Sequence, residues 1–207
     1  IEWKKFSDLH WSATAPTFSE AGTYAVQCHI QCEGYADFYG IALIQLGADD
    51  AVAFVSLSGR HKAPYDTPEN AAIDLQSAIE AVKGVETLGR RYVFVDVGSY
   101  GLPKRMTVEG LSLVGSGPSL TAIRGCGVDL KGSELRGMSF DGVSDAVTTE
   151  GECVIDGCEF RNAQWSRYVI FAGGHAVVTN TKIIDNTLNS VDTLGGGTAP
   201  FLLRTIG

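Results

Sequence analysis

A short motif centred on one glycine recurs in the second half of the chain and restricts the possible folds more than any other feature. Four stretches can be superimposed: TVEGLSLVG from residue 107, ELRGMSFDG from 134, VIDGCEFRN from 154 and VVTNTKIID from 177. The first apolar position of each copy is Val108, Leu135, Ile155 and Val178. The middle position is Gly110, Gly137, Gly157 and Asn180. The copies follow one another at irregular intervals of roughly twenty residues, which indicates a structural repeat with insertions.

A repeat of roughly twenty residues is too short for a propeller blade and matches one turn of a parallel β-helix. A single coil cannot bury its own apolar positions, so coils stack and equivalent side chains form columns inside the tube. Glycine or asparagine at the middle position fits a sharp corner, because both adopt positive φ at low cost. We therefore predict an all-β fold, a parallel β-helix of four to five coils. Its interior column should contain Val108, Leu135, Ile155 and Val178.

The composition fits a chain with many short strands and turns. Among 207 residues, 25 are glycine and only six are proline, without a collagen period. The net charge of −8 and the lack of a basic run argue against binding to nucleic acid. No stretch approaches the roughly 20 apolar residues that span a bilayer, so membrane insertion is not expected.

One amphipathic helix is predicted over residues 66–84. Asp66 or Thr67 can cap its start, Pro68 suits the first helical position, and Gly84 stands where a C-cap belongs. Its apolar residues recur every three or four positions, at Ala71, Leu75, Ala78, Ile79 and Val82. Such a helix should cover the end or the side of another element.

The N-terminal residues 1–62 are expected to form a separate antiparallel β region, and residues 63–207 the helix and the coils. The stretches TYAVQCHIQCEG, FYGIALIQLG and AVAFVSLSG suggest three strands, the last two joined by a tight acidic turn at residues 48–50. Aromatic residues are concentrated in this region. We expect them to form its core or a contact with a partner chain; the alternative is a platform on which sugars stack. The candidate contact aromatics are Trp3, Trp11, Tyr35, Tyr39 and Trp165.

The order of these segments resembles a known superfamily. The stretch AAIDLQSAIEAV, followed by YVFVDVGSY, LSLVGSGPSLTAIRG, GMSFDGV and CVIDGCEFRNA, resembles the start of right-handed β-helices of the pectin-lyase-like superfamily. That group includes pectin esterases, polysaccharide lyases, and tail-spike and surface proteins of bacteriophages. The resemblance covers about residues 66–187 and implies that the helix caps the N-terminal end of the tube. It indicates fold more specifically than activity.

Candidate catalytic groups are few. A glycosidase needs two carboxyl groups roughly 5–9.5 Å apart. The carboxylate candidates are Asp141, Asp156 and Glu159, yet Arg161 and Ile184 take the position of Asp141 in the next copies, so no acidic ladder forms. The motifs of pectin esterases, polygalacturonases and lyases are missing, and no catalytic residue is assigned.

Neither a metal nor a cofactor is expected. The cluster of Cys28, His29 and Cys32 is the densest group of possible ligands, but alternation along a strand would point His29 away from both cysteines. Cys153 and Cys158 are expected to be free thiols.

These features favour a non-catalytic structural or adhesive protein, a virion component such as a tail spike or capsid decoration. Its location would be a virion, the cell surface or the extracellular space. Its partners would be sister subunits, for example in a trimer, or another virion protein bound through the N-terminal region. The alternatives are a polysaccharide-degrading enzyme with clefts between subunits and a carbohydrate-binding bacterial surface protein. The apolar C-terminal residues Phe201, Leu202, Leu203 and Ile206 either stack against another chain or close their own core.

Overall fold

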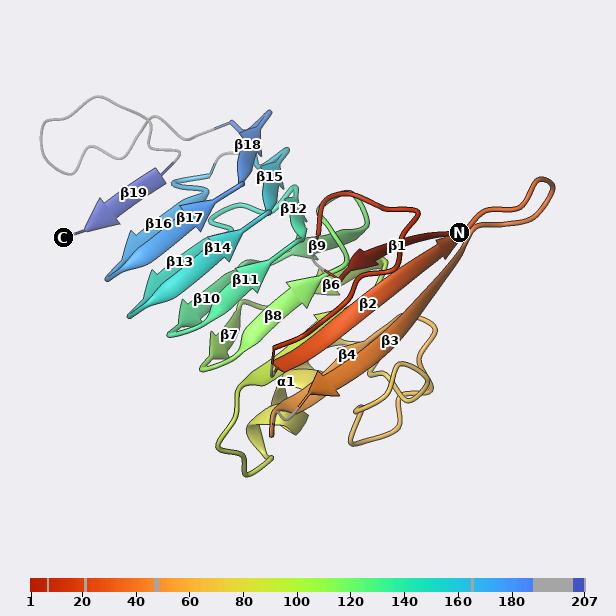
Figure 1. Cartoon of the computed structure of the whole chain (residues 1–207). Helices are drawn as coiled ribbons and strands as arrows, with labels where there is room; N and C mark the ends of the chain where they lie inside the picture. Colours follow the sequence, from red (N-terminus) through yellow and green to blue (C-terminus); the bar gives the residue numbers. More distant parts are fainter. Residues whose placement is uncertain (7, 21, 47–48, 165, 188–202, 207) are drawn as a thin grey trace, which may run out of the picture.

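The computed structural model is a parallel β-solenoid of about four turns with a small antiparallel sheet on one side (Figure 1). It describes the chain except for residues 7, 21, 47–48, 165, 188–202 and 207. Within the described part, no helix is long and apolar enough to cross a membrane.

Three parallel sheets form the walls of the solenoid, and we number them I to III in the order in which the chain passes through them from β7 onward. Sheet I contains β7 (Met106–Glu109), β10 (Val128–Lys131), β13 (Val147–Glu150), β16 (Ile170–Gly173) and β19 (Leu203–Ile206). Sheet II contains β4 (Ala51–Val55), β5 (Arg91–Val95), β8 (Ser112–Gly115), β11 (Glu134–Arg136), β14 (Cys153–Asp156) and β17 (Ala176–Thr179). Sheet III contains β6 (Gly98–Leu102), β9 (Thr121–Gly125), β12 (Ser139–Asp141), β15 (Glu159–Arg161) and β18 (Lys182–Ile184).

The repeated glycine marks the corner between sheets II and III. Gly137, Gly157 and Asn180 occupy equivalent corners with φ of 60°, 61° and 49°. This left-handed backbone turns the chain sharply, and it favours glycine or asparagine over other residues. The prediction of a corner at these three positions is confirmed.

The predicted interior column is correct for three of its four members. Leu135 pairs with Ile155, and Ile155 pairs with Val178. Val108, however, lies in sheet I beside Leu130, so its assignment to this column was wrong. The error arises because the corner between sheets I and II also carries a glycine of positive φ, Gly110, and the two corners look alike in sequence.

The N-terminal sheet is antiparallel and contains β1 (Glu2–Lys5), β2 (Gly22–Ile30) and β3 (Phe38–Leu46) in that order. The third strand predicted for this region, β4, is not part of it. It pairs in parallel with β5 and begins sheet II instead. The predicted hairpin between β3 and β4 is therefore wrong, and residues 47–48 of its turn lie outside the described part.

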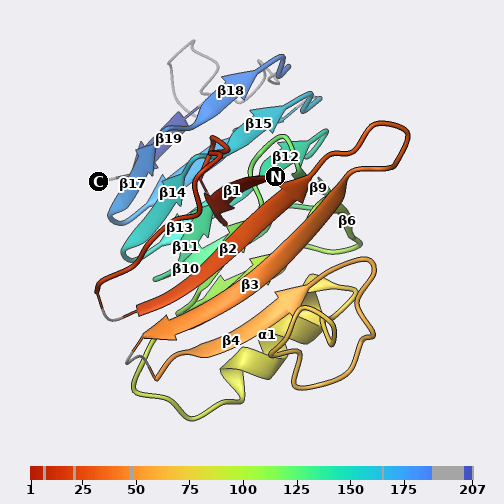
Figure 2. The ribbon, with the colours of Figure 1, turned by 45° about the vertical axis from the view of Figure 1, so that its right-hand side comes forward.

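The N-terminal sheet packs on the outer face of sheet II (Figure 2). One outward column of sheet II begins with Phe54, Phe94 and Val114, which are buried against Phe6 and Ala25. The same column continues with Arg136 and Asp156 in the following coils, beyond the apolar cluster. This column of sheet II thus changes from apolar to charged along the solenoid.

A buried polar cluster also joins the two parts. The ammonium group of Lys4 donates hydrogen bonds to the backbone carbonyls of Ser116 and Asp8, and the amide of Gln27 donates to the Ser116 hydroxyl at 2.9 Å. Burial lowers the pKa of Lys4 to about 8, against the opposing effect of Asp8. The N-terminal sheet is therefore fixed to the solenoid by both apolar and polar contacts.

The helix α1 (Leu75–Lys83) is shorter than predicted. Its N-cap is Asp74, whose carboxylate accepts hydrogen bonds from the backbone and hydroxyl of Ser77. The residues before Asp74 are held in a different conformation, because Ala72 forms a bridge to Val55 of β4. Gly84 is the C-cap, as predicted, and the buried face of α1 packs on β4 and β5.

At the other end of the solenoid, β19 pairs in parallel with β16. Leu203 and Ile206 are the first and last residues of β19, whereas Phe201 and Leu202 lie outside the described part.

Candidate functional site

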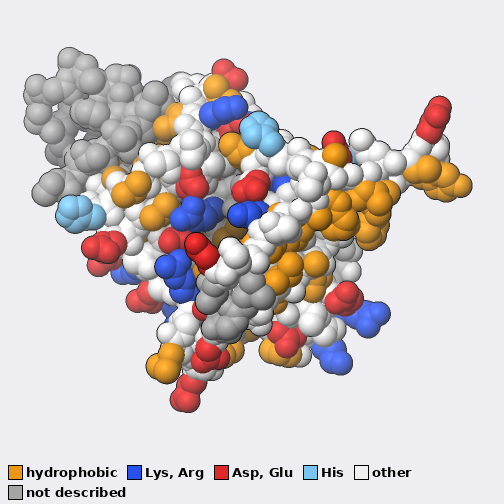
Figure 3. Space-filling model, viewed as in Figure 1, with side chains coloured by type: hydrophobic (Ala, Val, Ile, Leu, Met, Phe, Trp, Pro, Cys, Tyr) orange, Lys and Arg blue, Asp and Glu red, His pale blue; other side chains and the backbone are white. Residues whose placement is uncertain are grey.

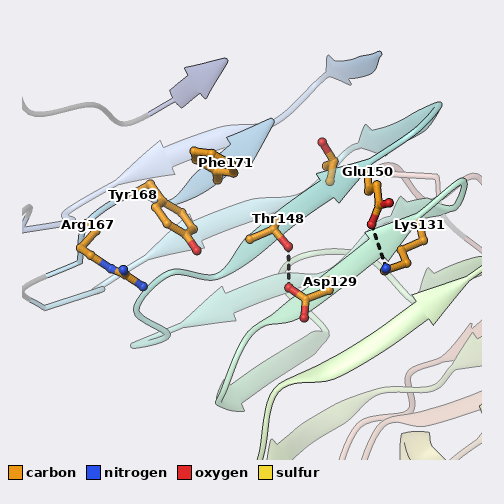
Figure 4. Close-up of a pocket in the computed structure, with 8 residues that line it drawn as sticks. Asp129, Lys131, Thr148, Glu150, Arg167, Tyr168 and Phe171 are labelled. Carbon is orange, nitrogen blue, oxygen red and sulfur yellow. Dashed lines mark hydrogen bonds and ion pairs between the residues drawn. The ribbon is translucent and has the colours of Figure 1, made fainter. Parts of the chain in front are cut away.

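A groove of about 610 Å³ opens on the outer face of sheet I (Figure 4). Side chains of β10, β13 and β16 and of the loop before β16 line it. They are Asp129, Lys131, Thr148, Thr149, Glu150, Arg167, Tyr168 and Phe171. Strand alternation explains the placement on β10, where Val128 and Leu130 are buried inside the tube while Asp129 and Lys131 point outward.

Asp129 lines the groove beside Thr148 and is held by Arg105 from the preceding coil. The Arg105 guanidinium contacts its carboxylate, with 2.5 Å between Nε and Oδ1, and the Thr148 hydroxyl donates to the same oxygen. Arg105 also donates hydrogen bonds to the backbone carbonyls of Val128 and Asp145. The Asp129 carboxylate is thus a fixed acceptor whose charge is balanced by Arg105.

A second ion pair shapes the loop that carries the aromatic part of the groove. Arg167 binds Asp145 through two side-chain nitrogens, at 2.9 Å from Nε and 2.7 Å from Nη2. The backbone amides of Arg167 and Tyr168 also donate to Asp145. Although burial raises the pKa of Asp145, the hydrogen bonds and charge of Arg167 outweigh it and hold that pKa below the usual value. The ionised carboxylate therefore anchors Tyr168.

Two aromatic rings occupy one end of the groove. The Tyr168 and Phe171 centroids are 5.3 Å apart at an interplanar angle of 43°, and the Arg167 guanidinium lies 5.7 Å from the Tyr168 ring. Burial raises the pKa of Tyr168, so its hydroxyl stays protonated and can donate a hydrogen bond. At the other end, Lys131 pairs with Glu150 at 2.8 Å (Figure 4).

This combination suits a ligand with both an apolar face and many hydroxyl groups. Aromatic rings bind apolar faces, and flanking charged or hydroxyl groups fix the orientation of a ligand. Both groove carboxylates already pair with a cation, so the arrangement favours binding over acid–base chemistry.

The predicted carboxylate candidates are not in this groove. Asp141 and Glu159 lie on sheet III, and the two contact the same Arg161, at 3.6 Å and 2.9 Å. Arg124 also pairs with Asp141 at 2.7 Å. The Asn162 side-chain hydrogen bond, followed by the charges of Arg161 and Arg124, lowers the pKa of Asp141 despite some burial.

Asp156 lies on a different wall, sheet II. Its carboxylate accepts hydrogen bonds from Arg136 at 2.8 Å, Thr179 at 2.7 Å and Asn180 at 2.9 Å. Burial raises its pKa, but these partners outweigh burial and the net pKa is lowered. Asp141 and Asp156 are thus held ionised, which is unfavourable for a general acid near neutral pH.

The candidate aromatics are only partly brought together. Tyr39 stacks on His29 with centroids 4.5 Å apart, and Trp11 lies 5.3 Å from His29. Trp3 lies on β1, and Tyr35 is 78% exposed in the loop between β2 and β3. Trp165 lies outside the described part.

Sequence reasoning missed Tyr168 and Phe171, which belong to the groove. A weak signal was available, because the interval between the copies that begin at residues 154 and 177 is longer than the one before it, and an insertion there can line a surface. The copies themselves contain no aromatic residue that faces outward on sheet I.

In the part of the chain that the structure describes, the cysteines and histidines form no metal cluster. His29 contacts Asp37 at 2.9 Å and Glu2 at 3.5 Å, and no group of three potential metal ligands occurs among the described residues. All five cysteines are free, and Cys153 and Cys158 are buried. Burial raises the pKa of Cys158 to about 12, so this thiol is an apolar core group.

Comparison with known proteins does not identify the chain. No family model matches it, and neither curated proteins nor solved structures give a match. The geometry of the groove and of the N-terminal sheet is therefore the basis for a functional assignment.

Proposed function

We propose that this chain is a non-catalytic structural or adhesive protein, in which the solenoid is a stiff spacer and the N-terminal sheet docks it to a partner. The observation that carries this proposal is the apolar outer face of the N-terminal sheet. Hydrophobic side chains gather over β2 and β3 (Figure 3). Extended apolar patches on a protein surface mark interaction sites.

Strand alternation separates the two faces of this sheet. Lys4, Ala25 and Gln27 are buried on the face toward the solenoid. The opposite face carries apolar side chains from all three strands, with Lys5 as its charged member. They are Trp3, Tyr24, Cys28, Ile30, Phe38, Ala42 and Ile44, whereas Val26 on the same face is buried and Phe18 stacks on Tyr24.

The groove on sheet I favours a second function, binding of a polysaccharide. Tyr168 and Phe171 place two aromatic rings at one end of the groove, and Asp129, Thr148 and Lys131 add polar groups along it. Such a site would make the solenoid an adhesive element. The alternative of a polysaccharide-degrading enzyme has less support, because the groove carboxylates are paired with cations and Asp141 and Asp156 have lowered pKa values.

Three finer points belong to the same proposal. We propose a right-handed coil of the pectin-lyase-like type, with α1 as its cap, because α1 packs on the first two strands of sheet II.

We also propose that the protein is a virion component, a tail spike or a capsid decoration. That point is supported by the resemblance of residues 66–187 to such proteins and by the docking face described above.

The experiment is a joint measurement of turnover and binding on a panel of acidic and capsular polysaccharides. Reducing ends and unsaturated products should stay at the level of a blank without protein. Any polysaccharide that binds should bind about tenfold more weakly to Tyr168→Ala, which corresponds to about 1.4 kcal/mol. Tyr35→Ala, which removes an exposed tyrosine far from the groove, is the matched control and should bind as the parent does. Sustained turnover on any substrate would overturn the non-catalytic assignment.

A further inference from the structure

The outer strand β3 of the N-terminal sheet has an open edge. It pairs with β2 on one side, and among the described residues its backbone makes no hydrogen bond to any other segment. A strand at a sheet edge presents unpaired amide and carbonyl groups, which can pair with another strand.

The side chains of β3 are also less buried than those of β2. In the neighbouring strand β2, Ala25, Val26, Gln27 and His29 are buried. By contrast, no residue of β3 whose exposure is described is buried, and Phe38 is 59% exposed. Even Ile41 and Leu43, which face the solenoid, remain only partly buried.

Soluble proteins usually protect such an edge with lysine, proline, a bulge or a short strand. β3 has none of these sequence protections: its nine residues, FYGIALIQL, include neither a charged residue nor a proline. Its length and apolar character therefore suit pairing with another strand.

The sequence of β3 is compatible with pairing to itself. In an antiparallel pair centred on Ala42, Ile41 would stand opposite Leu43 of the other copy, and Gly40 opposite Ile44. Phe38 would stand opposite Leu46. No like charges oppose one another within the strand, and every pair is apolar except Tyr39 opposite Gln45.

We propose that two copies of this chain associate by antiparallel pairing of β3 with β3 about a twofold axis near Ala42. This inference rests on the proposed docking role of the N-terminal sheet and names its partner as a second copy. The two N-terminal sheets become one continuous sheet, and their apolar outer faces lie side by side. A twofold contact of this kind is self-complementary and closes as a dimer, in place of the trimer considered from the sequence.

The experiment is sedimentation analysis of the whole chain from low to high micromolar concentration. The parent should be dimeric. The double variant Ala42→Lys with Ile44→Lys should be monomeric, because the lysines introduced at position 42 of the two copies would face each other across the axis. The matched control is Val177→Lys with Ile184→Lys, which adds the same charge at exposed positions on β17 and β18 and should stay dimeric. The chain carries a net charge of −8, so the two added lysines of either double variant reduce the overall electrostatic repulsion between copies. A change in net charge therefore cannot explain dissociation.

A cross-linking variant makes the test independent of weakened folding. Ala42→Cys should form a covalent dimer under mild oxidation, since the two Cα atoms meet at the axis within reach of a disulfide. The parent, which has its own exposed Cys32, gives the background. A monomeric parent, or a dimer that persists in the β3 variant, would overturn the pairing. Neither result changes the turnover and binding measured on polysaccharides, so failure of this inference is distinguishable from failure of the proposed function.

Discussion

The Phe160 ring stacks on the Phe140 ring of the preceding coil, with centroids 5.2 Å apart and an interplanar angle of 16°. Their backbones pair in register, and Ile183 continues the column in the next coil. Each coil thus completes the apolar environment of its neighbour, so that stability depends on stacking between coils.

The first prediction concerns this column. Phe160→Ala should lower the free energy of unfolding by about 3–5 kcal/mol, because a fully buried aromatic ring between two coils is lost. Urea denaturation followed by circular dichroism measures the change. Ile184→Ala, at a 42% exposed position on β18, should change stability far less. Equal effects of the two substitutions would contradict the packing described for the interior.

The second prediction concerns a corner of the solenoid. Gly157→Ala should cost about 1–2 kcal/mol, because its φ of 61° is unfavourable for a residue with a Cβ although space is available there. Gly157→Asn should cost less, since Asn180 occupies the equivalent corner with φ of 49°. Gly101→Ala is the control, with open space and no positive φ, and should be nearly neutral. A thermal or urea unfolding series would establish this order.

The third prediction concerns acid stability. The pKa of Asp141 is lower in the folded chain than its unfolded value of about 3.9. The unfolded chain therefore binds a proton more readily, so the stabilisation from Asp141 is complete above the unfolded pKa and is lost as pH falls through the folded pKa. Asp141→Asn should be less stable than the parent at pH 6, and the difference should shrink towards pH 3. A difference that is constant across this range would contradict the ionic role of Asp141.

The fourth prediction concerns Lys4, whose pKa is lowered to about 8 by burial. Between pH 8 and the unfolded value of about 10.4, the unfolded chain binds a proton that the folded chain has released. The contribution of Lys4 to stability therefore increases with rising pH across this window. Between pH 7.5 and 9.5, parent and Lys4→Met should differ in the slope of unfolding free energy against pH, with the parent rising more. Parallel curves would contradict a buried ammonium group.

The sequence was sufficient to predict the solenoid because its interior columns repeat in the chain itself. Leu135, Ile155 and Val178 could be aligned by their glycine or asparagine neighbours, which turn equivalent corners. Val108 could not be placed correctly by the same rule, because each coil has more than one corner that requires positive φ. The corner at Gly110, between sheets I and II, therefore looks the same in sequence as the corner at Gly137, between sheets II and III.

Other features depended on contacts that are distant in sequence. β4 has the apolar pattern of a hairpin strand, but its partner is β5, which follows only after the helix. The helix starts at Leu75 rather than near Asp66, because Ala72 is needed for backbone bonding to β4. The groove depends on Tyr168 and Phe171, which lie between two repeat copies and reach sheet I only when the coils are stacked.

The change of character along the outer column of sheet II, from Phe54, Phe94 and Val114 to Arg136 and Asp156, has a consequence for how this architecture can vary. Only the first coils carry the hydrophobic surface on which the N-terminal sheet lies. Whole coils could therefore be inserted or deleted beyond the corner at Gly157, which Leu9 of the N-terminal region approaches, without disturbing that attachment. The length of the solenoid can in this sense change independently of the N-terminal sheet that anchors it.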